Sequence, residues 1–97
     1  MEPEFVLGRA GELTAESIID LTSFEAFAEG VSRRHAMIKA LEDKYVLIDL
    51  NSSNGTWLNG ERLVPTRPYD LPSGGTIQLG RMKLVVFYSH PPGLKKG

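Results

Sequence analysis

Three short segments of the chain carry side chains that could bind a charged ligand. They are Gly8-Arg9, the stretch VSRRHA at 31–36 and the stretch NSSNGTWLNG at 51–60. Together they offer guanidinium groups, hydroxyls and amides. Arg binds phosphate oxygens in a bidentate manner, Ser hydroxyls and turn N–H groups can satisfy the remaining oxygens, and an Asn amide can bind a peptide main chain. The set is therefore suited to a tetrahedral dianion held next to a peptide.

The stretch at 51–60 is compatible with three roles when its composition is considered alone. It could be a flexible linker, a glycan acceptor or an ordered turn, since Asn51-Ser52-Ser53 and Asn54-Gly55-Thr56 both have the acceptor pattern. The chain has no cysteine and its first residues do not resemble a signal peptide, which argues against a glycan. Strand-like sequences adjoin the stretch on both sides, which argues against a linker. We therefore expect an ordered turn that presents polar groups.

Strand signals dominate the rest of the sequence. Apolar runs alternate with turn residues at 5–7, 35–41, 44–50, 56–58, 61–64, 76–79 and 82–88. Asn59-Gly60 and Gly80-Arg81 are expected to form tight hairpin turns. Near 23–29, apolar residues share one helical face, and we expect a short helical turn there. The pattern predicts an all-β fold, a sandwich of two twisted and mostly antiparallel sheets with one short helical turn.

The order of the three segments closely resembles the forkhead-associated (FHA) domain family. The resemblance is carried by Gly8-Arg9, then SRRHA, then LNSSNGTWLNG and finally TIQLG, and it extends from Phe5 to about Tyr88. The longer segment before SRRHA is similar to a bacterial-type subgroup. The resemblance implies an FHA-like β-sandwich whose loops at one end bind phosphothreonine peptides. The two strands that normally precede the Gly-Arg strand have no counterpart in this sequence.

The resemblance also implies a role for individual residues. Three of them would bind the phosphate: Arg9, Ser32 (through its hydroxyl and backbone N–H) and Ser53. Two would hold the peptide main chain on either side of the phosphoresidue: Arg33 and Asn54. Five would be architectural or would form turns: Gly8, His35, Gly55, Asn59 and Gly60. We expect neither a catalytic residue, a metal site nor a cofactor.

Composition limits the classes of partner. The net charge of −1 argues against a strongly basic nucleic-acid binder, and the longest apolar run, Leu84 to Phe87, is too short to span a membrane. Two histidines and no cysteine leave little for a metal site. We expect a cytoplasmic chain with an FHA-like phosphopeptide-binding domain at 1–90 and a flexible tail at 91–97.

The leading hypothesis is a non-catalytic signalling module that binds a phosphothreonine-containing protein or peptide, the substrate of a Ser/Thr kinase. The alternative is phospho-independent assembly. Without the two preceding strands, the last strand would leave an apolar edge at Leu84–Tyr88, through which the chain could form a homo-oligomer. An enzyme with Ser32 as nucleophile, His35 as base and Asp49 as orienting group is the weakest hypothesis, because no nucleophile elbow is present.

Overall fold

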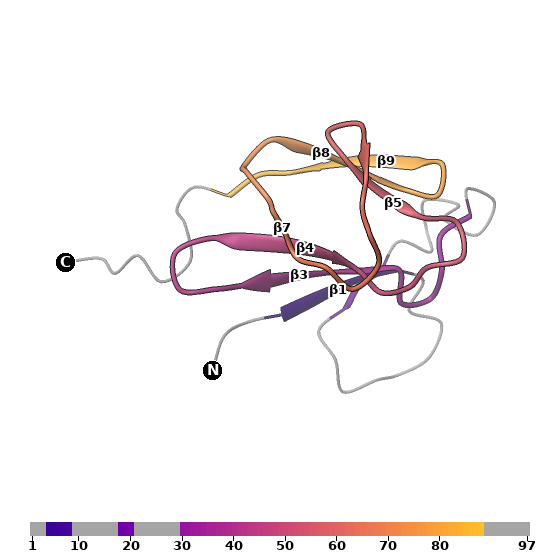
Figure 1. Cartoon of the computed structure of the whole chain (residues 1–97), viewed down its shortest axis with the longest axis horizontal. Helices are drawn as coiled ribbons and strands as arrows, with labels where there is room; N and C mark the ends of the chain where they lie inside the picture. The colour runs from indigo at the N-terminus through magenta and orange to yellow at the C-terminus, as the bar shows by residue number, and fades with distance from the viewer. Residues whose placement is uncertain (1–3, 9–17, 21–29, 89–97) are drawn as a thin grey trace.

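The structure is a computed structural model that describes residues 4–8, 18–20 and 30–88. Within these ranges the chain forms nine strands and no helix. The strands make two sheets that lie face to face, as Figure 1 shows. The predicted all-β sandwich of two mostly antiparallel sheets is confirmed. Nothing helical in the described ranges has the length and apolar character needed to cross a bilayer.

Sheet A contains five strands in the order β2-β1-β3-β4-β7. Their bounds are β1 Glu4–Gly8, β2 Ile18–Asp20, β3 Ala36–Ala40, β4 Tyr45–Asp49 and β7 Tyr69–Asp70. The pair β1 and β2 is parallel, and the other neighbouring pairs in this sheet are antiparallel. Short β2 and β7 thus form the two edges of sheet A.

Sheet B contains four strands in the order β6-β5-β8-β9, and all its pairs are antiparallel. Their bounds are β5 Thr56–Leu58, β6 Glu61–Arg62, β8 Gly75–Leu79 and β9 Met82–Val86. Both predicted hairpin turns are present. Asn59 and Gly60 have φ values of 51° and 86°, as a type I′ turn requires, and Gly80 has a φ of 61° in the turn from β8 to β9.

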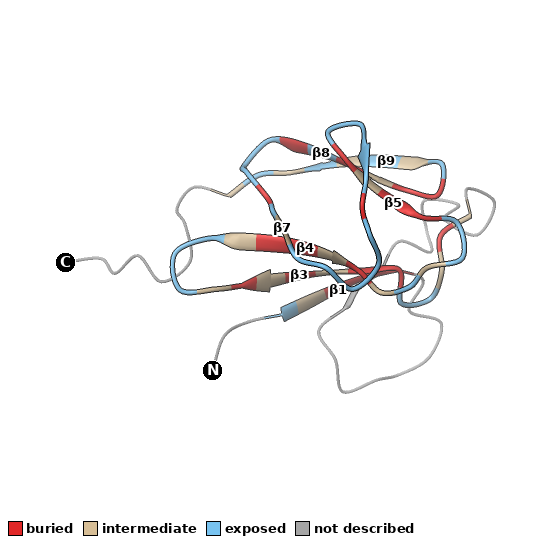
Figure 2. Ribbon diagram, in the orientation of Figure 1, coloured by how far each residue is buried: buried red, intermediate tan, exposed pale blue. Residues whose placement is uncertain are grey.

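The core lies between the two sheets, where alternate strand residues turn inward (Figure 2). Leu7 and Leu47 from sheet A and Ile77 and Leu79 from sheet B are fully buried. Burying one such side chain stabilises the fold by about 1.5–3 kcal/mol. The core therefore holds the two sheets together and fixes the ends of the strands that carry the loops.

The structure differs from the sequence expectation at two short strands, β2 and β7. The run Ile18-Ile19 suits a strand, but its pairing with β1 is parallel, so no hairpin signal in the sequence predicts it. β7 has only two residues, and its pairing with β4 depends on that neighbouring strand. The predicted helical turn near 23–29 and the predicted tail at 91–97 lie outside the described residues.

Strand pairing brings the three chemically interesting segments to one end of the sandwich. Leu7, at the end of β1, pairs with Ala36 at the start of β3, and Ala36 pairs with Asp49 at the end of β4. The end of β1, the start of β3 and the end of β4 therefore lie together at this end, on the right of Figure 1. We call it the loop end of the sandwich.

Candidate functional site

Gly8 lets the end of β1 approach the turn at Ser32 and Arg33 very closely. A Cβ atom on Gly8 would collide with the carbonyl oxygen of Arg33 and would lie 2.9 Å from that of Ser32. Real Cβ atoms do not come so near to a backbone oxygen, so a larger residue would displace the turn. Arg9, the next residue in the chain, lies outside the described residues.

His35 is fully buried, and both nitrogens of its ring are hydrogen-bonded to the backbone. The Ser32 N–H donates to Nδ1 over 2.9 Å, and Nε2 lies 2.7 Å from the Gly55 carbonyl oxygen. Since an N–H can only donate and a carbonyl can only accept, Nδ1 is unprotonated and Nε2 carries the proton. Burial lowers the pKa of His35, while the bond to Gly55 and the charge of Asp49 act in the opposite direction. A neutral ring thus joins the turn before β3 to the loop before β5.

The Gly55 carbonyl is a junction between the two sheets. It accepts a hydrogen bond from Nε2 of His35, which lies next to β3 in sheet A. It accepts a second one, over 3.0 Å, from the N–H of Gly80, which follows β8 in sheet B. The backbone of Gly55 has a φ of 91°, and a Cβ there would lie 2.9 Å from the guanidinium of Arg62. A side chain at this position would therefore disturb both the backbone and its surroundings.

Asp49 braces the loop between β4 and β5 from inside. Its Oδ1 accepts from the hydroxyls of Ser52 (2.6 Å) and Thr56 (2.5 Å), and its Oδ2 accepts from the Ser52 N–H (3.2 Å). Ser52 Oγ in turn accepts from the Gly55 N–H over 3.0 Å. Asp49 and Thr56 are almost completely buried. Because buried polar groups are costly when unpaired, this network holds the loop in one conformation.

Ser53 and Asn54 lie on the outer side of this loop and are exposed. The Ser53 N–H donates to Ser32 Oγ over 3.4 Å, and the Asn54 side-chain amide donates to the Gly30 carbonyl over 2.9 Å. Gly30 has a φ of 84°, and a Cβ on it would lie 2.9 Å from Asn54 Nδ2. These contacts connect the loop at 51–55 to the turn at 30–33. The polar surface they form is what we call the serine cluster: Ser32, Ser53 and Asn54.

A comparison with known families decides what kind of domain carries this surface. The model of the FHA domain matches residues 5–80. This chain belongs to the FHA domain family. The protein FraH from Nostoc sp. is 41% identical over 69 residues, which cover 71% of this chain and 24% of FraH. The chain therefore spans about a quarter of the length of that relative.

Solved FHA structures share the fold. One comes from work on phosphothreonine-dependent FHA domain interactions and has 31% identity, a TM-score of 0.64 and coverage of 92% of this chain and 80% of that one. Another is the N-terminal FHA domain of S. cerevisiae Rad53p in complex with a phosphothreonine peptide. It has 27% identity, a TM-score of 0.66 and coverage of 89% and 68% of the two chains. The Rad53p domain thus binds a phosphothreonine peptide on the same fold.

In this FHA domain, the described binding-type residues gather at the loop end, while Asn59 and Gly60 lie elsewhere. Ser53 is hydrogen-bonded to Ser32, Asn54 is hydrogen-bonded to Gly30 at the start of the same turn, and Arg33 is exposed beside Ser32. Asn59 instead ties β5 to β8, because its N–H donates to the Thr76 carbonyl and its Oδ1 accepts from the Thr76 N–H. Arg9 belongs to the predicted phosphate ligands but lies outside the described residues.

Two details of the sequence interpretation need correction. The Ser32 N–H was expected to bind the phosphate, but it donates to His35 Nδ1, so the hydroxyl is the part of Ser32 that can face a ligand. The imagined arrangement of Ser32, His35 and Asp49 as nucleophile, base and orienting group is not formed. Both nitrogens of His35 bind backbone groups, and the Asp49 carboxylate binds Ser52 and Thr56.

Sequence reasoning missed the bracing residues Asp49, Ser52 and Thr56 as a group. A signal was available, because an Asp at the end of a strand and a Ser three residues later often form a local side-chain to backbone turn. Within the described part of the chain, no cluster of His, Asp or Glu side chains could hold a metal ion.

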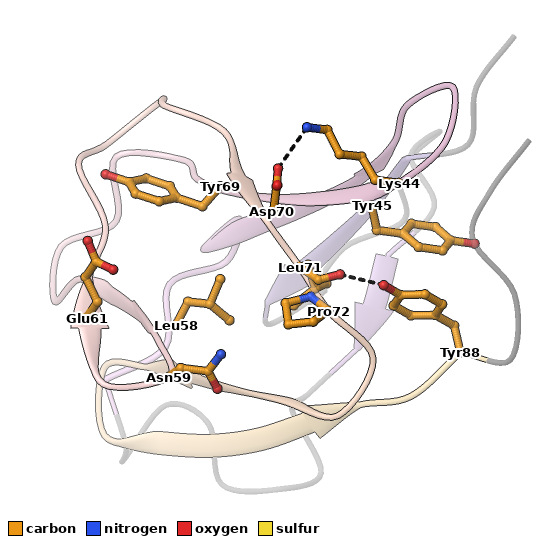
Figure 3. A pocket seen from close by; sticks show the side chains of 10 residues that line it. All are labelled: Lys44, Tyr45, Leu58, Asn59, Glu61, Tyr69, Asp70, Leu71, Pro72 and Tyr88. Atoms are coloured by element: carbon orange, nitrogen blue, oxygen red, sulfur yellow. Dashed lines mark hydrogen bonds and ion pairs between the residues drawn. The ribbon is translucent and has the colours of Figure 1, made fainter.

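A concave region of the described structure is lined by none of the residues of the serine cluster (Figure 3). It is an open groove of about 510 Å³ lined by Lys44, Tyr45, Leu58, Asn59, Glu61, Tyr69, Asp70, Leu71, Pro72 and Tyr88. Several of its polar groups are already paired. Lys44 lies 3.0 Å from the carboxylate of Asp70, the Tyr69 hydroxyl accepts from the Val64 N–H, and the Tyr88 hydroxyl donates to the Leu71 carbonyl. This groove therefore offers a ligand fewer unpaired polar groups than the loop end does.

Proposed function

We propose that this FHA domain is a non-catalytic signalling module that binds proteins phosphorylated on threonine by a Ser/Thr kinase, in the cytoplasm. The observation that carries the proposal is the contact between Ser32 and Ser53. The two loops that carry these serines are held by hydrogen bonds of the buried side chains of His35 and Asp49. Two serines held against each other by a hydrogen bond at the end of a sandwich are a suitable receptor for phosphate oxygens. The phosphothreonine peptide held by the related Rad53p domain supports the same class of ligand.

The proposed contacts follow the geometry of the loop end. Ser32 Oγ accepts from the Ser53 N–H, and no described residue takes up the Ser32 hydroxyl proton, which leaves that proton for a phosphate oxygen. The Ser53 hydroxyl would bind a second oxygen. Arg9 directly follows Gly8 in the sequence, and the Gly8 backbone lies against the Ser32-Arg33 turn. We assign Arg9 the main ion pair with the same phosphate. The ion pair between Arg9 and the phosphate would supply most of the binding free energy.

Arg33 and Asn54 would hold the peptide main chain on either side of the phosphothreonine. Asn54 is anchored by its amide donating to Gly30, which fixes the plane of the amide and directs its oxygen away from that bond. An oriented side-chain carbonyl can accept from a peptide N–H without a large loss of rotamer entropy. Arg33 is exposed and close to Ser32 in the chain, where it could donate to peptide carbonyls.

The charge of the ligand sets two general expectations. A phosphothreonine carries about −1.5 to −2 charges at pH 7, with a second pKa of about 6. The affinity should therefore decrease as salt is added, and it should decrease as the pH is lowered through about 6, where the phosphate takes up a proton.

The test is calorimetric titration with a phosphothreonine peptide library and with the same peptides unphosphorylated. We expect binding of the phosphorylated set only. Arg9→Ala should cost roughly 2–5 kcal/mol of binding free energy, the range for one member of a desolvated charge pair. Lys44→Ala is the matched control, because it removes an exposed charge of the same sign at the β3–β4 turn, at the other end of the sandwich. Equal binding of the two peptide sets would remove the proposal.

The alternative function, phospho-independent assembly, is favoured by one observation. Among the described residues, β9 pairs with β8 on one side and with no strand on the other.

A further inference from the structure

Four side chains form a row on the face of sheet B that is turned away from sheet A. Trp57 lies between two buried residues of β5, so its own side chain points to the outer face. It pairs with Arg62 of β6 and with Gln78 of β8. Gln78 in turn pairs with Lys83 of β9. Directly opposite residues of neighbouring strands share a face, so this row, which we call the basic row, crosses all four strands.

The positive charge of the basic row is not offset within the sheet. The strands of sheet B contain one acidic residue, Glu61. Glu61 pairs with the core residue Leu58 and lines the groove of Figure 3, so it belongs to the opposite face. Arg62 and Lys83 are exposed, and in the described part of the chain neither makes an ion pair with a carboxylate. The outer face is therefore complementary to a ligand that carries carboxylates.

Arg62 lies where this face meets the loop end. Its guanidinium carbon is 5.2 Å from the centroid of the Trp57 ring, within the range of a cation–π contact. The same guanidinium lies against Gly55, where a Cβ would approach it to 2.9 Å. Gly55 directly follows Asn54, the residue proposed to hold the peptide main chain. A guanidinium placed on a ring loses little conformational freedom when its N–H groups bind a carboxylate.

We propose that the outer face of sheet B binds an acidic segment of the same partner that carries the phosphothreonine, through Arg62 and Lys83. This inference rests on the proposed function, because the phosphothreonine would hold the partner at the loop end. The contact between Arg62 and Gly55 makes the two surfaces continuous, so one extended chain can occupy both.

The spacing of the strands defines the acidic segment. Neighbouring strands lie about 4.8 Å apart, so the three intervals from β6 to β9 place Arg62 and Lys83 roughly 14 Å from each other. An extended chain rises about 3.3 Å per residue, and residues separated by an even number point to the same side. Two carboxylates four positions apart therefore match the two cations, with the residue midway between them over Trp57 and Gln78.

The first test is calorimetric titration with a phosphothreonine peptide that carries two glutamates four positions apart, joined through Gly-Ser spacers of several lengths. The glutamates are placed on the N-terminal side of the phosphothreonine in one set and on the C-terminal side in the other. We expect a gain in affinity of about two- to tenfold on one side only, the range for two exposed ion pairs. Glutamines in their place should give no gain, and added salt should remove it.

A gain that is equal on both sides, or absent from both, would overturn the inference, because general electrostatic attraction does not depend on the side. Arg62→Gln and Lys83→Gln should each lose most of the gain while they bind the glutamine peptide as the wild type does. Lys44→Gln is the matched control, because it removes a lysine from the β3–β4 turn of sheet A. It should keep the gain. Equal losses in Lys44→Gln and Lys83→Gln would show that net charge is responsible.

The second test uses Trp57, the single tryptophan of the chain. A carboxylate bound to Arg62 should shift the emission of the ring beside it. Titration with the unphosphorylated glutamate peptide at low salt should give a saturable shift in the wild type and in Lys44→Gln, and none in Arg62→Gln. No shift in the wild type would overturn the inference. A shift without any preference for phosphorylated peptides would count against the proposed function instead, so the two failures are distinguishable.

Discussion

Nε2 of His35 donates a 2.7 Å hydrogen bond to the carbonyl oxygen of Gly55, twenty residues further along the chain. The same carbonyl accepts from the Gly80 N–H, while Nδ1 of the same ring accepts from the Ser32 N–H. One buried side chain and one carbonyl thus connect the turn at 30–33, the loop at 51–55 and the end of β8. The relative position of Ser32 and Ser53 depends on this connection.

Stability should therefore decrease as the pH falls below the ordinary pKa of histidine. Burial lowers the pKa of His35 in the folded chain, so the unfolded chain takes up a proton first. The stability is complete above about pH 6.5 and is lost between that value and the folded pKa, with a slope of at most about 1.4 kcal/mol per pH unit. Urea unfolding at several pH values measures this slope.

The contribution of His35 to this slope can be separated from that of other groups. His35→Gln should flatten the slope, and His90→Gln, which replaces the other histidine, should leave it unchanged. If His35→Gln does not fold, NMR titration of the wild-type imidazole resonances gives the same information. A His35 ring that titrates at or above the ordinary histidine pKa would contradict the prediction.

Gly8→Ala should weaken both the fold and phosphopeptide binding. The new methyl group would collide with the Arg33 carbonyl and push away the turn that carries Ser32. Overpacking of this kind costs about 1–3 kcal/mol. Thermal unfolding and peptide titration measure the two effects on the same protein.

Gly60→Ala is the informative comparison. A Cβ on Gly60 would meet no atom within 4 Å, but the backbone has a φ of 86°. The cost should be about 1–2 kcal/mol from backbone strain alone. Affinity for the phosphopeptide should not change in Gly60→Ala, and a parallel loss of affinity in both variants would show that stability, rather than the position of the turn, decides binding.

Much of this fold could be predicted from local sequence. Apolar runs between turn residues predicted β3, β4, β8 and β9, and Asn59-Gly60 predicted the tight turn in which both residues adopt positive φ. β2 and β7 could not be predicted in the same way, since strands of two or three residues depend on the neighbour that they pair with.

The candidate site shows the same division between local and long-range information. Ser53 and Asn54 stood out as turn residues, but the sequence did not reveal that Ser53 would meet Ser32 or that Asn54 would bind Gly30. Those contacts join residues more than twenty positions apart, and they follow from strand register rather than from composition. The role of Asp49 was missed for the opposite reason. At the end of an apolar strand it was considered only as a catalytic group, although its partners lie within seven residues.

Asp49→Ala should destabilise the domain and loosen the loop at 51–55. The variant leaves the fully buried Thr56 hydroxyl and the Ser52 hydroxyl and N–H without their acceptor. An unpaired buried polar group costs about 1–3 kcal/mol. Chemical denaturation measures the loss, and Asp43→Ala, which removes an exposed carboxylate from the turn between β3 and β4, is the control. Equal stability of the two variants would show that the network does not hold the loop.

Ser52→Ala should lower the stability of the domain and Ser53→Ala should leave it nearly unchanged, although the two residues are neighbours. Ser52 Oγ donates to Asp49 and accepts from the Gly55 N–H, so its loss should lower the free energy of unfolding by about 1 kcal/mol. The Ser53 hydroxyl makes no bond to a described residue, and the N–H that donates to Ser32 is kept in the alanine variant. Ser53→Ala should therefore leave stability within about 0.5 kcal/mol of the wild type.

Affinity for the phosphopeptide should change the other way round: it should fall in Ser53→Ala and stay nearly the same in Ser52→Ala. A hydrogen bond from Ser53 to a charged phosphate is worth about 1.5–3 kcal/mol, so Ser53→Ala should weaken phosphothreonine binding by at least about tenfold. Ser52→Ala should bind nearly as well as the wild type at temperatures where it is fully folded, because Ser52 points toward Asp49 and not toward the ligand. Calorimetric titration of both variants with one phosphopeptide decides the matter. A loss of affinity confined to Ser52→Ala would mean that the loop presents a different serine to the phosphate.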